Sequence, residues 1–186
     1  MKQLFLLATI LLSIHLFSQE KVSDTIQSSS LEDSISEFQK FRLNGSFGRT
    51  FSSDSRFNFN SYFVKSGFGF KINKHFWVNT DFFGMRYGVS REGLIFTNWT
   101  FAPNISKDFD FGKIKLIGSV GLFYTLEEVK SSNYERSTSD AGAILGVKCY
   151  YEVYKNMYLG FDFSGIAYYY MDMDVFMFGP SIEFRL

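Results

Sequence analysis

The sequence of 186 residues is poor in proline and cysteine, with 2 prolines and the single cysteine Cys149. One cysteine excludes an intramolecular disulfide framework. Neither sign of charge is in excess, because Lys plus Arg and Asp plus Glu number 19 each. The zero formal net charge gives no reason to expect nucleic acid as a partner. Aromatic residues, by contrast, are abundant, with 24 Phe and 11 Tyr.

One long apolar run is present, and it lies at the N-terminus. Met1-Lys2 gives a positive start, residues 4–17 are almost uninterrupted apolar, and Ser18-Gln19 follow. This layout predicts a secretory signal peptide over 1–18, cleaved after Ser18 or Gln19. A helix over 4–17 reaches only about 21 Å, which is short of the ~30 Å hydrocarbon core of a membrane. No cysteine lies near the cleavage site, so a lipoprotein anchor is not expected.

Residues 19–40 are polar and rich in serine, and they contain few large apolar residues. This composition predicts a flexible periplasmic linker. Leu31, Ile35 and Phe38 recur at helical spacing, so a short amphipathic docking helix is the alternative.

From Phe41 onward the apolar residues recur with a period of two. In 176–186 every even position is apolar or proline, while Glu183 and Arg185 lie between them. Strict alternation predicts strands with one apolar and one polar face. A phase slip within 57–72 suggests a bulge near Asn60-Ser61. The expected strands are 41–51, 57–72, 76–88, 93–105, 112–127, 140–152, 158–170 and 174–186.

Most of these strands are longer than the five or six residues usual in soluble domains. Crossing a membrane on a tilt takes about 9–11 residues per strand. The expected turns at 73–75, 106–111 and 154–156 are short, whereas 129–139 is long and polar. Short periplasmic turns and longer extracellular loops are typical of outer-membrane barrels. The fold class predicted for 41–186 is therefore all-β: an eight-stranded antiparallel up-and-down transmembrane barrel.

The polar face is expected to point inward, because eight strands leave an interior that side chains can fill. Charges buried there must be paired. A soluble barrel with a wetted polar face is the alternative. The predicted interior charge network consists of Arg42, Lys65, Asp81, Lys115, Lys148, Asp162 and Glu183.

The signal, the apolar C-terminal strand and the alternation of turns and loops resemble the eight-stranded outer-membrane protein A and X barrels. The aromatic-rich style and the Phe-Ser-Gln-Glu exit from the signal resemble Bacteroidetes-type outer-membrane β-barrel domains. The resemblance implies an outer-membrane location, with lipid and lipopolysaccharide as surroundings. It also implies an assembly signal read by the barrel-assembly machinery. That signal ends in an aromatic residue in many relatives, whereas here Phe184 is followed by Arg185 and Leu186.

Catalytic, cofactor and metal sites are not expected. His15 falls in the predicted signal and His75 in a predicted periplasmic turn, so neither provides a general base at the outer surface. Eight filled strands also disfavour a wide solute pore. The favoured function is a structural or surface-binding role through an extracellular loop that contains Lys130, Tyr134, Glu135 and Arg136. The alternatives are a barrel subunit of an envelope secretion or assembly complex, with an envelope protein as partner, and a small lipid-modifying enzyme.

Overall fold

The computed structural model describes residues 40–52, 61–89, 94–131, 134–169 and 174–186. The predicted signal peptide and all of the predicted linker except Lys40 lie outside these ranges, so both remain predictions. Within the described ranges, no helix is long and apolar enough to cross a membrane. The strands are β1 (Phe41–Ser52), β2 (Tyr62–Lys71), β3 (Phe76–Val89), β4 (Leu94–Phe111), β5 (Ile114–Ser131), β6 (Tyr134–Tyr154), β7 (Met157–Tyr168) and β8 (Asp174–Arg185).

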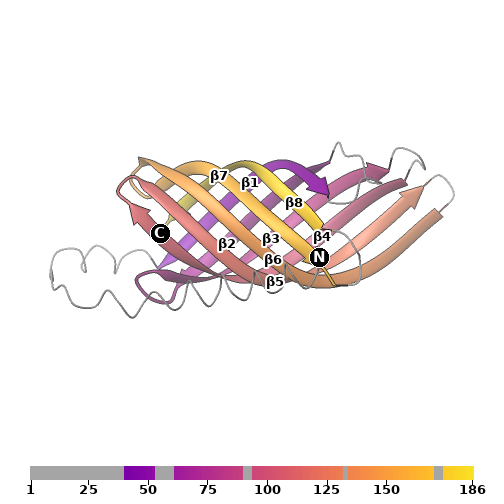
Figure 1. Ribbon diagram of the computed structural model, residues 1–186, viewed down its shortest axis with the longest axis horizontal. Coiled ribbons are helices and arrows are strands. Elements are labelled where there is room, and N and C mark those ends of the chain that lie inside the picture. The colour runs from indigo at the N-terminus through magenta and orange to yellow at the C-terminus, as the bar shows by residue number, and fades with distance from the viewer. Residues whose placement is uncertain (1–39, 53–60, 90–93, 132–133, 170–173) are drawn as a thin grey trace.

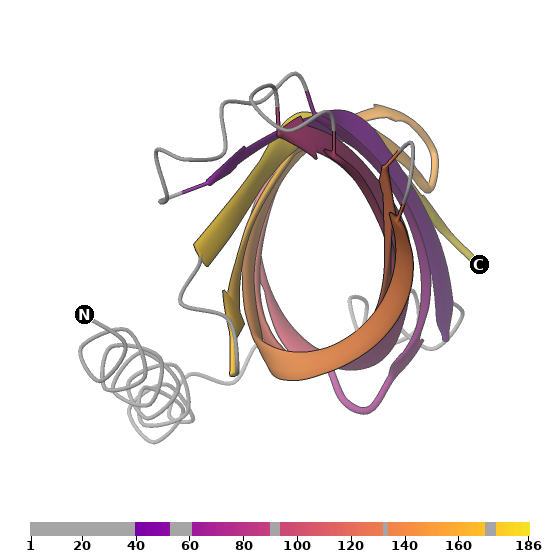
Figure 2. The same cartoon turned by 90° about the vertical axis from the view of Figure 1, so that its right-hand side faces the viewer.

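These eight strands form one closed antiparallel barrel, which confirms the predicted fold class. Each strand pairs with the next along the chain, and β1 pairs with β8 to close the sheet. Figure 1 shows the tilted strands from the side, and Figure 2 shows the elliptical outline of the barrel in the end view. Closure leaves no strand edge unpaired within the ring, which is how such a sheet avoids exposed backbone donors and acceptors.

Side chains alternate between the interior and the outer surface as the period of two requires. In β2, for example, Lys65 is 2% exposed while Phe68 is 42% exposed. Polar inside and apolar outside is the reverse of a soluble barrel.

The predicted turn at 106–111 is wrong, because β4 continues to Phe111. Ser106 and Asp108 keep the inward phase of the strand and are buried. The chain reverses instead at Gly112, whose φ of 69° suits glycine, and Lys113 completes this two-residue turn.

The predicted long loop at 129–139 is also wrong. β5 and β6 continue their pairing through Lys130↔Glu135 and Val129↔Arg136, leaving only 132–133 between them. This β5–β6 hairpin projects beyond the other strands at the end opposite the C-terminus (Figure 1). A polar sequence can still form these strands, because β5 pairs with β6 and, up to Lys130, also with β4, and these ladders satisfy the backbone groups.

The predicted bulge near Asn60-Ser61 falls at the border of the description, since Asn60 lies outside it. Ser61 is described, and its carbonyl accepts a hydrogen bond from the amide of Thr50 at 3.2 Å. A register shift does occur in β6, between Glu152 and Tyr154. It precedes the turn at Lys155 and Asn156.

Candidate functional site

The barrel interior has a polar layer at the turn end and an apolar cluster toward the hairpin end. Arg42 is the centre of the polar layer: Nε donates to Asn79 Oδ1 at 2.8 Å, and Nη1 donates to Asp108 Oδ1 at 3.2 Å. Its guanidinium lies 4.7 Å from the ring centroid of Trp77. Glu183 is the other carboxylate within reach, at 3.9 Å from Nη1. Arg42 on β1 is thus held by side chains of β3, β4 and β8.

Arg185 extends this group at the last residue of β8. Its Nε donates to Glu183 Oε1 at 2.8 Å, and Nη2 lies 2.8 Å from Asp108 Oδ2. The same Asp108 oxygen accepts the indole N–H of Trp77 at 3.0 Å. Sequence reasoning missed Trp77, Asp108 and Arg185. Arg185 could have been predicted to point inward, because it lies two residues after Glu183 on the same strand.

A second charged group lies around Asp162 on β7. Lys65 Nζ is 2.5 Å from Asp162 Oδ2, and Lys148 Nζ is 4.0 Å from the same oxygen. Lys148 also donates to Asn44 Oδ1 at 3.2 Å, and Ser164 Oγ donates to the second Asp162 oxygen at 2.7 Å. One carboxylate therefore serves two ammonium groups from strands on either side of the interior.

Asp81 is connected to the Arg42 group through two asparagines: Asn79, which accepts from Arg42, donates to Asn104 Oδ1 at 2.9 Å. Asp81 is buried and accepts a hydrogen bond from the side-chain amide of Asn104 at 3.1 Å. Lys115 lies at the rim of the turn end, 2.5 Å from the half-exposed Asp110. Of the seven predicted residues, the structure therefore pairs Arg42 with Glu183, and Lys65 and Lys148 with Asp162. It also links Asp81 to Arg42 through Asn104 and Asn79.

Toward the hairpin end the interior contains an apolar cluster that sequence reasoning did not predict, together with buried polar residues such as Asn98, Thr125 and Glu127. The rings of Phe123 and Tyr168 meet edge to face at 5.1 Å between centroids. Because the outer face is also apolar here, alternation in hydrophobicity is weak and gives no signal for an inward Phe. The cluster comprises Phe63, Phe83, Met85, Ala102, Phe123, Ile144, Ile166, Tyr168, Val175 and Met177.

The outer surface carries an apolar belt with aromatic residues at both ends. Tyr62, Trp99 and Tyr169 are exposed near the hairpin end, and Tyr151 and Tyr154 are exposed near the turn end. Soluble monomers rarely expose apolar area on this scale. A belt between two aromatic girdles is the surface that a transmembrane barrel presents to lipid.

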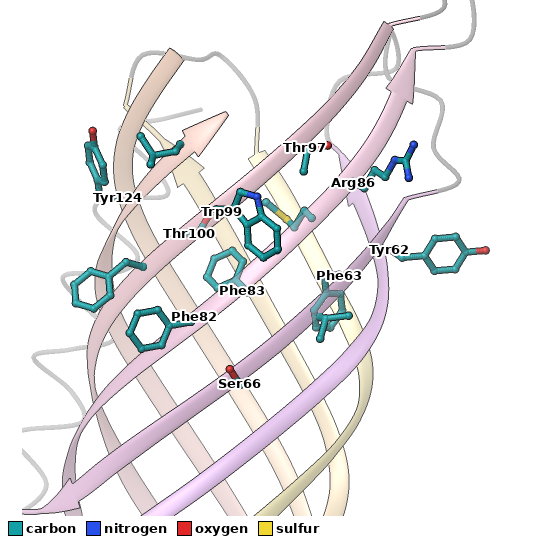
Figure 3. Close-up of a pocket in the computed structure, with 15 residues that line it drawn as sticks. Tyr62, Phe63, Ser66, Phe82, Phe83, Arg86, Thr97, Trp99, Thr100 and Tyr124 are labelled. Carbon is teal, nitrogen blue, oxygen red and sulfur yellow. The ribbon is translucent and has the colours of Figure 1, made fainter. Parts of the chain in front are cut away.

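A groove of about 690 Å³ interrupts this belt on the outer wall of β2–β5. We call it the wall groove. Gly84 forms part of its floor, and a Cβ atom added there would lie 3.1 Å from the ring of Trp99. Figure 3 shows Trp99 against β3, with Tyr62 and Arg86 projecting to one side. Its lining includes Tyr62, Val64, Phe82, Gly84, Arg86, Trp99, Phe101, Tyr124 and Leu126.

The β5–β6 hairpin carries the predicted contact residues. Lys130 Nζ lies 2.9 Å from Glu135 and 3.5 Å from Glu128, and the hydrogen bond to Glu135 is the main cause that raises the pKa of Lys130. Arg136 is exposed, and the side chain of Tyr134 is not among those that the structure describes. His75 lies in the β2–β3 turn at the opposite end of the barrel.

Both residues of the predicted assembly signal are on the outer surface. Phe184 and Leu186 are exposed, and the backbone of Leu186 exchanges hydrogen bonds with Phe41 at 2.9 and 3.0 Å. The end of the chain is thus paired with the first strand.

Comparison of folds gives similar structures. Ail, the attachment invasion locus protein of Yersinia pestis, is 12% identical with a TM-score of 0.60, over 80% of this chain and 99% of its own. The N-terminal β-barrel domain of Pseudomonas aeruginosa OprF is 12% identical with a TM-score of 0.61, over 80% and 98%. Neisserial surface protein A is 14% identical with a TM-score of 0.62, over 78% and 97%.

No protein-family model matches the sequence, and no curated protein matches it. The Bacteroidetes-type resemblance therefore stays a prediction. The chain has the fold of the small eight-stranded outer-membrane β-barrels.

Proposed function

We propose that this chain is an integral outer-membrane barrel with a structural or surface-binding role, and that it forms no wide solute pore. The observation that carries the proposal is its polarity: the exposed belt is apolar, while ion pairs such as Lys65–Asp162 are buried inside. This arrangement is unfavourable in water and favourable in lipid, where an apolar outer face needs no hydration.

The lengths of the connections at the two ends of the barrel support one orientation of the barrel in the membrane. The two-residue turns at Gly112-Lys113 and Lys155-Asn156 lie at the same end as the C-terminus. Short turns belong to the periplasmic end of outer-membrane barrels. The β5–β6 hairpin would then extend from the cell surface, where Lys130, Glu135 and Arg136 offer mixed charge to a partner. Lipopolysaccharide is the partner we favour for this surface.

Biogenesis belongs to the same proposal. A signal peptide over 1–18 would direct export, and the barrel-assembly machinery would read Phe184 and Leu186 on the last strand. Residues 19–40 would remain in the periplasm as a linker. The aromatic-rich composition fits a Bacteroidetes-type barrel.

Fractionation tests the location. We expect the protein in the outer-membrane fraction, with a heat-dependent shift in mobility on denaturing gels. A protein recovered from the soluble periplasm, with no shift, would overturn the proposal.

Cysteine labelling tests the orientation in intact cells. In a Cys149→Ser background, Ser137→Cys on the hairpin should react with a membrane-impermeant maleimide, because Ser137 is exposed. Lys113→Cys, in the opposite turn, is the matched control and should react only after the outer membrane is permeabilised. Labelling of position 113 but not 137 in intact cells would show the reverse orientation.

A further inference from the structure

The wall groove is lined mainly by outward-facing residues of four strands. Gly84 has no side chain, and the ring of Trp99 lies close above it. Trp99 is itself 64% exposed. Phe82 and Phe101 pack beside it, with 5.2 Å between their ring centroids. Tyr62 is the first residue of β2, so the groove lies at the hairpin end of the belt. It is therefore an apolar recess in the outer surface of the barrel.

Two arginines flank one end of this groove. Arg49, Tyr62 and Arg86 are direct register partners on β1, β2 and β3. All three are exposed on the outer face, and the Arg49 guanidinium lies 5.7 Å from the ring centroid of Tyr62. Figure 3 shows Tyr62 and Arg86 projecting together from neighbouring strands.

Neither arginine is neutralised by a carboxylate within the described part of the chain. Glu128 and Glu135, the exposed acidic residues of the nearby hairpin, lie within ion-pair distance of Lys130 instead. Two guanidinium groups at a water–lipid boundary attract an anion, and their planar donor pattern matches phosphate oxygens.

We propose that the wall groove with Arg49 and Arg86 is a binding site for a phosphate-bearing lipid of the outer leaflet. One acyl chain lies in the groove against Trp99, and the phosphate lies between the two arginines. This rests on the proposed function, because it requires the belt to be in the outer membrane. A neutral lipid would use only the groove, and a soluble anion would use only the arginines; an anionic lipid uses both.

The opposite end of the barrel offers a matched control. Lys107 is an outward-facing cation near the turn end, stacked at 5.2 Å on Phe76 and at 5.6 Å on Phe109. It does not line the wall groove. Lys107→Gln therefore removes one outward positive charge at a membrane interface without touching the proposed site.

The experiment uses the full-length barrel in phosphatidylcholine nanodiscs. These are doped with bisphosphorylated lipid A, with dephosphorylated lipid A or with phosphatidylglycerol, and native mass spectrometry counts the lipids that stay bound. We expect the phosphorylated form to be retained preferentially. Arg49→Gln/Arg86→Gln should lower that preference by about tenfold, whereas Lys107→Gln leaves it unchanged. Gly84→Leu, which fills the floor, should reduce retention of both lipid A forms.

Several outcomes would overturn the proposal. These are equal retention of the phosphorylated and dephosphorylated forms, a double variant that behaves as the parent, and equal retention of phosphatidylglycerol, which would indicate general attraction of anionic lipids. A heat-shift gel on the same nanodiscs separates this from failure of the proposed function. A barrel that inserts and shifts but shows no preference refutes only the lipid site.

Discussion

At the scale of single residues, the buried charges depend on one another. Lys65 and Asp162 are each almost completely buried, and they lie 2.5 Å apart. Such a pair contributes little net stability relative to apolar residues, but removing one partner leaves the other charge buried without compensation. The interior of the turn end should therefore be sensitive to changes that alter charge without altering volume.

Asp162→Asn is the sharpest test of this dependence. It keeps the size of the side chain but leaves the ammonium groups of Lys65 and Lys148 without their shared carboxylate. We expect the free energy of unfolding to fall by about 3–5 kcal/mol. Urea titration of the refolded barrel in lipid bilayers, followed by tryptophan fluorescence, measures it.

Asp110→Asn is the matched control. The ion pair of Asp110 with Lys115 lies at the rim, where the aspartate side chain is 49% exposed. Because solvent screens an exposed pair, its loss should cost less than about 1 kcal/mol. Equal losses for Asp110→Asn and Asp162→Asn would contradict the role given to burial.

At the scale of elements, the β4–β5 turn depends on the conformation of one residue. Gly112 has a φ of 69°, where a Cβ atom is unfavourable, although it meets no neighbour within 4 Å. Gly112→Val should therefore lower the free energy of unfolding by about 1–2 kcal/mol through backbone strain alone. Asn156→Gly, at a φ of 66° in the β6–β7 turn, is the control. It should leave stability unchanged or slightly raised, and a loss there would argue against a conformational cause.

The β5–β6 hairpin is held near its tip by Lys130 and the two glutamates beside it. The raised pKa of Lys130 means that its contribution is complete at neutral pH and is lost as pH rises above the ordinary lysine value of 10.5. Lys130→Gln should speed amide exchange of residues 128–131 and 135–137 at neutral pH, without changing global stability. Arg136→Gln, an exposed neighbour, is the control. Unchanged exchange in Lys130→Gln would show that backbone pairing alone holds the hairpin.

Sequence periodicity predicted most of the strands and which of their residues point inward. It failed where a residue's structure depends on a partner that is distant in the sequence. Asp108 falls in the predicted turn at 106–111, whereas in the structure it is a strand residue whose partner Arg42 lies 66 residues away. The polar stretch at 129–139 gave no apolar alternation, yet the pairing of β5 with β6, and of Val129 and Lys130 with β4, makes it part of two strands. The inward Phe63 and Phe123 were missed because both faces are apolar there. The wall groove arises from side chains on four strands, and no local pattern encodes it.

At the scale of the whole molecule, both polar and apolar side chains fill the barrel interior. The polar layer, centred on Arg42 and Arg185, fills the turn end, and the apolar cluster lies toward the hairpin end with buried rings such as Phe83 and Phe123. Ions crossing the barrel would have to pass both. The apolar cluster gives no hydration to an ion, and the polar layer is locked by ion pairs to Asp108 and Glu183.

Because both sets of side chains block the interior, shortening the side chains of one set alone should not raise the ion conductance. Phe83→Ala/Phe123→Ala should leave bilayer conductance at background, because the polar layer still blocks the turn end. Arg42→Ser/Arg185→Ser should do the same, because the apolar cluster remains. Of these variants only the quadruple one should pass ions above background, with a low conductance because Lys65, Lys148 and Asp162 still fill part of the interior. Planar-bilayer recording of proteins that retain the heat-dependent gel shift measures this. Conductance in the parent, or in either double variant, would mean that one set of side chains is bypassed by a path along the wall.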